Sequence, residues 1–379
     1  MNVHVYPSPL THESRIIRIT SALVDGGVFD EVQVIGVLRS GLRQVEHIDK
    51  HRSLVRLPRR VAIKGFLSKV VATIEWSVRV LLYLRDKKVE CINAHSLAVL
   101  PLCAIASMLK RAKLVYDTHE LETETSGSFG IRKRIAKLVE RIFIQRCDKV
   151  FVVSDSIAKW YTETYAIDMP TVIRNIPDAS ENKISRRSEL RLRLLIAEDC
   201  PLFIYQGGFI EGRGLERMLQ VFRALPESNL LCMGQGPLEN LVVAAVAECP
   251  NIHLVPPVPP NEVLEYTRAA DVGVCLTDKS CLSHDFSLPN KVFEYLHAGL
   301  PIIVNLLTEQ RALVQRYKCG WIAPENDEQL ASLIDSIDRQ TILNLSSNVE
   351  HASADLTWEK EKERLLNAYK NPLGGLANA

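Results

Sequence analysis

Apolar and polar positions alternate along this chain in two patterns that succeed one another from end to end. Short β-branched runs, such as residues 31–38 and 149–153, are typical of buried strands. Stretches with apolar residues three and four positions apart, such as residues 98–109 and 215–224, are typical of helices. Because strands alternate with helices of about 10–15 residues, the pattern predicts βαβ units around parallel sheets, and hence the α/β class.

The alternation pauses once, in the polar stretch that follows Asn175-Ile176-Pro177-Asp178, and then restarts. We therefore expect two doubly wound Rossmann-like domains that face one another across a cleft. The expected bounds are 1–175 for the first domain, 176–195 for a linker and 196–355 for the second domain. The last segment, 356–379, contains an amphipathic helix that could pack back on the first domain. In open parallel sheets ligands bind beyond the carboxyl ends of the strands, so residues just after strands are the candidates for function.

Composition narrows the class of protein. The chain has 379 residues, of which 47% are hydrophobic and 24% charged, as in an ordinary globular protein. The longest uncharged apolar run, Leu97–Leu109, is shorter than the roughly 20 residues of a membrane-spanning helix. Nine cysteines are scattered without a Cys-x-x-Cys pair, and the first residues do not resemble a signal peptide. We therefore expect reduced thiols, no zinc site and a cytoplasmic location.

The charge of the chain is divided unevenly. Residues 1–175 carry 27 Lys and Arg against 18 Asp and Glu, whereas residues 176–379 carry 19 against 27. A basic half favours contact with an anionic partner, either a membrane surface or a nucleic acid. No aromatic-rich platform accompanies the charge, so a nucleic acid is not expected. Independent drift of two domains would explain the division equally well.

The strongest local motif covers residues 284–301, with the sequence His-Asp-Phe-Ser-Leu-Pro-Asn-Lys-Val-Phe-Glu-Tyr-Leu-His-Ala-Gly-Leu-Pro. Ser287 suits a helix N-cap, Pro289 the first helical turn and Gly299 the position after the helix end. The free N–H groups at such a helix start bind anions. Glu294 lies about one and a half turns into the helix. It is either a solvated residue or a packed carboxylate that accepts both hydroxyls of a ribose.

Two glycine-rich turns and one histidine turn give weaker signals. In Gly207–Leu215 a strand ends in a turn that lets the backbone approach a ligand, and Arg213 could form two hydrogen bonds to phosphate oxygens. Met233–Pro237 is a second such turn, although any tight strand-to-helix turn uses glycine. Val115–Leu121 places His119 and carboxylates after a strand, but a lone histidine is more often structural.

These motifs together resemble the family-4 glycosyltransferases, which have the GT-B fold and retain the configuration of the transferred sugar. The resemblance is carried by residues 207–215, Gly234-x-Gly236-Pro237 and residues 287–301, and by residues 116–120 and 148–154 in the first half. It implies that residues 1–175 form the acceptor-side domain and that residues 196–355 bind a UDP- or GDP-sugar.

The resemblance also implies roles for single residues. Glu294 would hold the ribose hydroxyls of the donor, His119 would contact the transferred sugar, and Arg213 would lie at the diphosphate. These three are the candidate catalytic residues. The candidate donor-binding residues are Gly208, Arg213, Gly236, Val258, Asp285, Phe286, Ser287, Leu288, Pro289, Asn290 and Glu294.

The sequence departs from the family pattern at three places. Phe286 stands where the family has its first glutamate, with Asp285 beside it. Gly208 stands where a second basic residue is usual. The first turn, residues 7–15, lacks the common glycine pair, and Arg15 or His12 could take over its phosphate role.

The expected chemistry follows from the leaving group. A departing nucleoside diphosphate gains negative charge, and it needs either a metal ion or fixed positive groups. The chain has no Asp-x-Asp motif for a metal, but it has Arg213 and the predicted helix start at Ser287–Asn290. We therefore expect metal-independent transfer, with no metal-binding residues and no cofactor. An acceptor hydroxyl would attack from the face that the phosphate leaves, and His119 would stabilise the transition state.

The basic residues of the first half indicate the acceptor. The helical stretch Ile131–Lys149 interleaves basic and apolar residues, which suits anionic lipid headgroups but equally a solvated face over a core helix. The candidate acceptor or membrane contacts are Arg15, Arg132, Lys133, Arg134 and Lys137. A hexose or N-acetylhexosamine would then pass to a lipid-diphosphate-linked saccharide at the inner face of the plasma membrane. Assembly of a bacterial surface polysaccharide such as lipopolysaccharide would use this reaction.

Two other functions remain open. A sugar-nucleotide 2-epimerase shares the architecture and needs acid–base residues, but it needs no acceptor. A catalytically inactive GT-B partner protein is the non-enzymatic alternative, and Phe286 favours it. A nicotinamide dehydrogenase is not expected, because neither half has Gly-x-Gly-x-x-Gly after its first strand.

Overall fold

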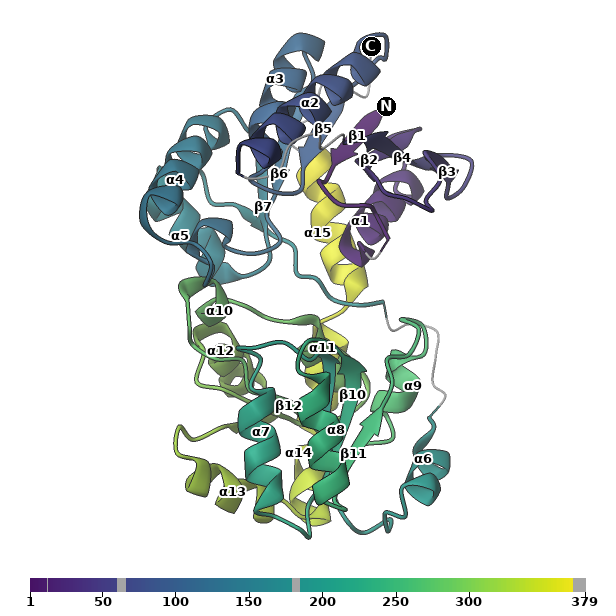
Figure 1. Cartoon of the computed structure of the whole chain (residues 1–379), viewed down its shortest axis with the longest axis vertical. Helices are drawn as coiled ribbons and strands as arrows, with labels where there is room; N and C mark the ends of the chain where they lie inside the picture. The colour runs from purple at the N-terminus through teal and green to yellow at the C-terminus, as the bar shows by residue number, and fades with distance from the viewer. Residues whose placement is uncertain (12, 60–65, 179–184, 371–379) are drawn as a thin grey trace. The chain divides into compact units, whose positions relative to one another are not determined.

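The computed structural model describes residues 1–11, 13–59, 66–178 and 185–370. The chain divides into two compact units, one formed by Met1–Arg174 with Glu361–Ala379 and one formed by Asn175–Lys360. Each unit contains one sheet whose strands are connected by helices (Figure 1). The α/β class predicted from the alternation of strands and helices is therefore confirmed.

The first unit contains an eight-stranded sheet. Its strands are β1 (Asn2–Val5), β2 (Val32–Leu38), β3 (Val45–His47), β4 (Arg52–Pro58), β5 (Cys91–Ala94), β6 (Lys113–Asp117), β7 (Lys149–Val152) and β8 (Thr171–Val172). They lie in the order β3-β4-β2-β1-β5-β6-β7-β8, and only the edge strand β3 is antiparallel to its neighbour. The strand order reverses between β1 and β5, which is where doubly wound sheets bind their ligands.

The helices of the first unit connect these strands. They are α1 (Ser14–Asp25), α2 (Phe66–Leu84), α3 (Leu100–Lys110), the short 3-10 helix η1 (Glu122–Glu124), α4 (Gly130–Ile144), α5 (Asp155–Tyr165) and the C-terminal α15 (Trp358–Lys370). The Tyr369 hydroxyl of α15 donates to Asn93 Oδ1 of β5 at 2.5 Å, and both side chains are buried. The last helix, drawn in yellow in Figure 1, is thereby part of the first unit from Glu361 onward.

The second unit contains a six-stranded parallel sheet. Its strands are β9 (Leu202–Gly208), β10 (Asn229–Gln235), β11 (Ile252–Val255), β12 (Val272–Cys275), β13 (Ile302–Val304) and β14 (Gly320–Ile322). The order β11-β10-β9-β12-β13-β14 is the arrangement of a Rossmann fold, with the reversal between β9 and β12. Its helices are α6 (Arg187–Arg193), α7 (Leu215–Arg223), α8 (Glu239–Glu248), α9 (Val263–Thr267), α10 (Leu282–Asp285), α11 (Asn290–His297), α12 (Thr308–Tyr317), α13 (Asp327–Asp335) and α14 (Arg339–Asp355).

The described part of the segment expected as a linker, 176–195, belongs to this second unit. Ile176 and Leu190 are almost completely buried, and both belong to the same hydrophobic cluster as the central strands. The sequence suggested a linker because the apolar residues of this stretch are few and widely spaced. Only the folded chain shows that they are covered.

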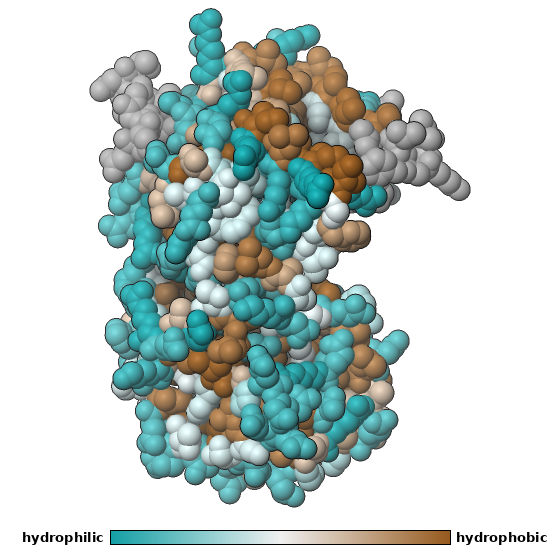
Figure 2. Space-filling model, turned by 90° about the vertical axis from the view of Figure 1, so that its left-hand side faces the viewer, coloured by the Kyte–Doolittle hydropathy of each residue, from teal (hydrophilic) through white to brown (hydrophobic). Residues whose placement is uncertain are grey.

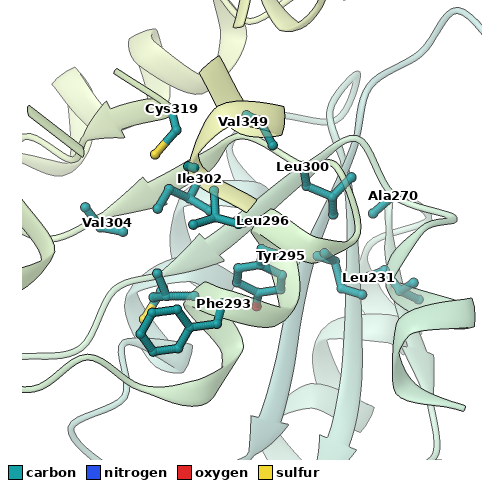
Figure 3. Close-up of a cluster of buried hydrophobic side chains, with 14 of the residues drawn as sticks. Leu231, Ala270, Phe293, Tyr295, Leu296, Leu300, Ile302, Val304, Cys319 and Val349 are labelled. Carbon is teal, nitrogen blue, oxygen red and sulfur yellow. The ribbon is translucent and has the colours of Figure 1, made fainter. Parts of the chain in front are cut away.

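Helix α11 is fixed by the core of the second unit. Tyr295 and Leu296 lie among Leu231, Leu300 and Ile302 in Figure 3, and all five side chains are buried. The Tyr295 hydroxyl donates to the Val274 carbonyl of β12 at 3.2 Å. A Cβ at Gly273 would lie 2.2 Å from Tyr295 Cγ, so the glycine of β12 is what allows this ring to pack on the strand. The opposite face of α11 is thereby held at the carboxyl end of the sheet.

Candidate functional site

The glycine-rich turns of the second unit pack against each other. A Cβ at Gly234 would lie 1.9 Å from the carbonyl oxygen of Gly207, and a Cβ at Gly236 would lie 2.5 Å from that of Phe209. Both glycines have positive φ, 155° for Gly234 and 157° for Gly236. Close packing of backbone on backbone therefore accounts for them. A contact of Gly236 or Gly208 with a nucleotide stays a prediction.

Glu294 lies on the half-buried face of α11 and is held by a neutral partner. Its Oε2 accepts a hydrogen bond from Gln206 Nε2 at 2.5 Å. The orientation of that amide is fixed, because Gln206 Oε1 accepts from the Thr267 hydroxyl at 2.6 Å. Of the two alternatives that the sequence left open, the structure supports a packed carboxylate. It is a positioned anionic acceptor of the kind that a pair of sugar hydroxyls requires.

The structure brings to the same place a cation that the sequence analysis missed. The ammonium group of Lys291 lies 3.7 Å from the centre of the Tyr205 ring, beside Gly207. Arg213, in the turn between β9 and α7, is near enough to lower the pKa of Lys291 by repulsion. Spacing was the available signal, because residues 291 and 294 are three apart and share one face of a helix.

The start of α11 corrects the cap predicted from the sequence. The helix begins at Asn290, and Pro289, not Ser287, occupies the N-cap. The Ser287 hydroxyl and backbone N–H both donate to the His284 carbonyl, at 2.8 and 3.1 Å, because α10 ends directly before. Pro289 has no N–H group. Of the stretch expected to bind an anion, only Leu288 and Asn290 still have a backbone N–H to offer.

Three other predicted donor contacts have partners within the fold, and their contact with a donor stays a prediction. Asp285 is buried, accepts a hydrogen bond from the Thr308 N–H at 2.9 Å and pairs with Lys279 at 3.3 Å. Asp285 therefore holds the start of α12. Leu288 and Val258 pack against the core. Phe286, which follows α10, is half-buried.

In the first unit a buried ion pair joins α1 to the end of β6. Arg15 Nη2 lies 2.6 Å from Asp117 Oδ1, and Arg15 Nε donates to Asp117 Oδ2 at 3.1 Å. Arg15 Nη1 donates to the Ile173 carbonyl at 2.8 Å. The guanidinium is thus committed within the fold, which corrects the acceptor role expected for Arg15. His12, the other candidate for that role, lies outside the described residues.

His119 is half-buried and lies beside a buried hydrogen-bond chain. His119 Nε2 lies 3.2 Å from His95 Nδ1, which also lies 3.1 Å from Asp117 Oδ2. His95 Nε2 lies 2.7 Å from His4 Nδ1, and His4 Nε2 lies 3.1 Å from Asn2 Nδ2. Because a carboxylate can only accept, the network assigns the proton of His95 to Nδ1 and that of His4 to its own Nδ1. The chain therefore runs in one direction, towards Asp117.

Burial sets the charges in this chain. It lowers the pKa of His95, against the attraction of Asp117, and lowers the pKa of His4 well below its usual value, with repulsion from His95 adding to the effect. Burial alone would raise the pKa of Asp117, but Arg15 and the hydrogen-bonded histidines hold it well below its usual range. Asp117 is therefore a permanent anion. One of its carboxylate oxygens lies 3.7 Å from His119 Nε2.

The same three residues have the spacing of metal ligands. Ligand atoms of His95, Asp117 and His119 lie within 4.8 Å of one another, so geometry allows a metal ion where none was expected. Arg15 opposes one, because its guanidinium donates to both oxygens of Asp117 and adds a positive charge at the site. The absence of a metal requirement stays a prediction.

Helix α4 buries a charged residue and exposes apolar ones, which is the reverse of an ordinary amphipathic helix. Its buried Glu140 accepts hydrogen bonds from the hydroxyls of Tyr116, Tyr161 and Tyr165 at 2.7–2.8 Å. The other side exposes a stripe of large apolar residues. We call the exposed apolar residues of α4 and of its neighbours α2 and α3 the apolar surface: Val71, Ile74, Val78, Leu82, Ile105, Met108, Leu109, Ile131, Ile135, Leu138 and Ile142. Hydrophobic residues gathered near the top of Figure 2 belong to this unit.

The basic residues predicted on α4 differ in their exposure. Lys133 and Lys137 both pair with Glu124, whereas Arg132 and Arg134 have exposed side chains. The paired lysines are thus partly neutralised. In the part of the chain that the structure describes, no helix is both long and apolar enough to cross a membrane.

Two family models match successive parts of the chain. Glycosyltransferase Family 4 matches residues 13–181, and Glycosyl transferases group 1 matches residues 200–339. No curated protein matches the chain.

Solved structures share the fold over the whole length. Sucrose-phosphate synthase from Thermosynechococcus elongatus is 16% identical, with a TM-score of 0.79 over 98% of this chain and 99% of that chain. HepE from Anabaena, solved with UDP and glucose, is 16% identical, with a TM-score of 0.73 over 98% and 99%. WaaG, a glycosyltransferase involved in lipopolysaccharide biosynthesis, is 16% identical, with a TM-score of 0.71 over 98% and 100%. The two family models place the chain among the family-4-type glycosyltransferases, and the two Rossmann-like units together with these structural similarities show that it has the GT-B fold.

Proposed function

We propose that this glycosyltransferase is a retaining, metal-independent enzyme. It moves a hexose or an N-acetylhexosamine from a UDP- or GDP-sugar to a lipid-linked saccharide, in the assembly of a surface polysaccharide. The observation that carries the donor part is Glu294, fixed by Gln206 on the face of α11 that also bears Lys291. The similar HepE structures contain UDP and UDP-glucose, which supports a nucleotide sugar as the donor.

The second unit supplies the groups that a nucleoside diphosphate needs. Glu294 accepts the ribose hydroxyls, and Arg213 pairs with the diphosphate. Charge develops on the phosphate oxygen as the bond to the sugar breaks, and fixed positive groups stabilise it without reorganisation. The leaving phosphate accepts the proton of the acceptor hydroxyl, which attacks from the same face and so retains the sugar configuration.

The first unit supplies His119 for the transferred sugar. An imidazole next to the permanent anion Asp117 is stabilised when it donates a hydrogen bond or gains positive charge. Such a contact strengthens as the sugar oxygens change charge, and it therefore serves the transition state more than the ground state.

The acceptor and the membrane are proposed from the surface of the first unit. Aliphatic side chains on three neighbouring helices remain exposed, among them Ile131 with 74% and Leu109 with 69% of their surface accessible. Exposed arginines, Arg132 and Arg134, lie on the same helix as this apolar stripe. Apolar area beside positive charge fits the headgroup region of an anionic bilayer, where a lipid-linked acceptor resides.

Donor binding to Glu294→Ala tests the proposed function. We expect the wild type to bind UDP or GDP in calorimetry and to discriminate against the 2′,3′-dideoxy nucleotide. Glu294→Ala should lose about 2–3 kcal/mol and that discrimination, because charge-assisted hydrogen bonds to the ribose are lost. Glu328→Ala, an exposed glutamate of α13, is the matched control.

The products separate the remaining alternatives. Transfer requires that the sugar becomes linked to the acceptor and that the nucleoside diphosphate is released with it. Release of nucleotide without an acceptor-linked sugar would favour the 2-epimerase-like reaction. Binding of neither UDP nor GDP would overturn the proposed donor site and favour an inactive partner protein.

A further inference from the structure

A lysine of the second unit forms no ion pair in the described part of the fold. Lys291 is the second residue of α11, and its ammonium group reaches back over the Tyr205 ring of β9, 3.7 Å from the ring centre. The Tyr205 hydroxyl donates to the Gly208 carbonyl at 2.8 Å, so the ring is held in place. A Cβ at Gly207 would lie 3.7 Å from Lys291 Nζ. The end of the lysine side chain therefore lies next to this turn, at ordinary contact distance.

Unlike Lys291, the buried arginines elsewhere in the chain are paired with carboxylates. Arg15, Arg56 and Arg191 each form an ion pair with a carboxylate, those of Asp117, Glu46 and Asp271 respectively. Among the described residues, neither Lys291 nor Arg213 forms an ion pair or a side-chain hydrogen bond. Both side chains are half-buried, and a partly buried charge without an ion-pair partner is stabilised when a ligand supplies the opposite charge.

The two cations also repel each other. Burial and the repulsion from Arg213 lower the pKa of Lys291 to about 8, against the attraction of Glu294. An anion held between the two groups offsets this repulsion, and it does so more strongly the more negative charge it carries. A diphosphate offers more charge and more oxygens to the two groups than a single phosphate or carboxylate does.

We propose that Lys291 is the second diphosphate-binding cation of the donor site, acting together with Arg213. The inference rests on the proposed function, since it names the group that holds the leaving nucleoside diphosphate of that reaction. The basic side chain that is absent at Gly208 is replaced by one that arrives from α11. Lys291 and Glu294, one turn apart on the same helix face, then bind the diphosphate and the ribose of one nucleotide.

Binding of UDP, UMP and uridine to Lys291→Met tests this inference by calorimetry, with the GDP series if guanine is preferred. Loss of a charged hydrogen bond should weaken UDP binding about ten- to a hundredfold while uridine binding stays unchanged. The ratio of UMP to UDP dissociation constants should fall accordingly. Lys291→Arg should retain most of the UDP affinity, which shows that charge and not packing is lost. Lys318→Met, at an exposed lysine of the same unit, is the matched control.

A pH series provides a second readout. UDP affinity of the wild type should fall between about pH 7 and pH 9, as Lys291 loses its proton, and this fall should be absent in Lys291→Met. The titratable and charged groups that face Lys291 are Tyr205, Arg213, Cys232, Cys275 and Glu294. Burial raises the pKa of Cys232 to about 12 and that of Tyr205 above its ordinary value, so neither accounts for the fall.

The outcomes distinguish the inference from the function on which it rests. If the wild type binds UDP and Glu294→Ala weakens it, but Lys291→Met binds UDP as tightly as the wild type, the inference about Lys291 is overturned and the proposed function stands. If UMP and uridine lose as much affinity as UDP in Lys291→Met, the lysine acts on the fold of α11 and the inference is again overturned. If the wild type binds none of these nucleotides, the proposed function itself fails.

Discussion

Arg15 and Asp117 form an enclosed ion pair whose side chains are only 6% and 2% exposed, although they lie 102 positions apart in the sequence. The pair ties α1 to the carboxyl end of β6. It also places a permanent anion behind His95 and His119. One interaction therefore serves both the packing of the first unit and the electrostatics of its candidate site.

Asp117→Asn should lower the free energy of unfolding of the first unit by about 3–5 kcal/mol, because it leaves Arg15 buried without a counter-charge. The double variant Arg15→Met/Asp117→Asn should recover part of this loss, since the unpaired charge is gone. Urea unfolding measures both. The exposed pair Arg85–Asp86 is the control, and Asp86→Asn should leave the free energy of unfolding nearly unchanged, because water screens this pair. Equal effects of Asp117→Asn and Asp86→Asn would contradict the structural role of the buried pair.

Glu122 should make the stability of the first unit depend on pH. Burial raises the pKa of this carboxyl to about 7, although the Ser96 hydroxyl and the Leu97 N–H donate to it. Because the folded pKa lies above the unfolded one, the folded state holds the proton more tightly. Stability should therefore fall as pH rises from about 4.5 to about 7, by at most about 3 kcal/mol. Melting temperatures of the wild type should drop across this range and those of Glu122→Gln should drop less. Parallel curves would exclude Glu122 as the cause.

His119→Ala should reduce turnover much more than donor affinity. Loss of a contact that strengthens in the transition state costs kcat about a hundredfold, whereas the Kd for the nucleotide should change by less than about threefold. Steady-state kinetics and calorimetry on the same preparation measure the two effects. His47→Ala, at an exposed position of β3, is the control. A large loss of donor affinity with turnover intact would make His119 a ground-state binding residue.

Chelators should leave transfer active. The proposed leaving-group stabilisation uses Arg213, so Arg213→Ala should raise the barrier by at least about 2 kcal/mol, roughly thirtyfold in rate. Arg213→Lys should recover only part, because the two-pronged contact is lost. Activity that disappears in EDTA and returns with magnesium or manganese would assign the role to a metal ion.

Binding to vesicles should depend on both charge and apolar area. Cosedimentation should increase when phosphatidylglycerol is added to phosphatidylcholine vesicles, and it should decrease with salt. Arg132→Glu/Arg134→Glu should weaken it by about 1 kcal/mol per residue or more. Ile135→Glu/Leu138→Glu should weaken the vesicle binding that persists at high salt, because both side chains belong to the exposed apolar surface. Lys133→Glu and Lys137→Glu should each weaken vesicle binding less than the arginine substitutions do, since these lysines already pair with Glu124.

The exposed Leu343 of α14 provides the control for these vesicle experiments, and Leu343→Glu should leave vesicle binding unchanged. If the wild type fails to sediment with anionic vesicles even at low salt, a soluble acceptor replaces the lipid-linked one.

Sequence alone is sufficient for the α/β class and for the motifs in which all the participants are close in the chain. Helix and strand periodicity is local, so the pattern of residues alone predicts β9, α11 and the turn that contains Arg213. The elements that were not predicted are the helices α5, α6, α10, α13 and α14 and the strands β3, β4, β8 and β14. β4 contains Arg52 and Arg56, which interrupt the apolar pattern of a buried strand. The strand is therefore not predicted unless the distant partners of these arginines are known. Arg56 can be buried because its guanidinium donates hydrogen bonds to the carbonyls of Pro9 and Leu10 and pairs with the carboxylate of Glu46.

What the tertiary structure decided depended on partners that are far apart in sequence. Arg15 looked available for a phosphate until Asp117 and Ile173 were brought to it, and Ser287 looked like a cap until α10 was placed directly before it. The apolar side of α4 looked suited to a core until Glu140 took the inner position beneath three tyrosine hydroxyls. Lys291 lay inside the strongest motif, but its direction depends on the packing of Tyr295 against Gly273, which fixes the orientation of α11. A sequence determines which groups are present, whereas their charge and availability follow from the long-range contacts that bury them.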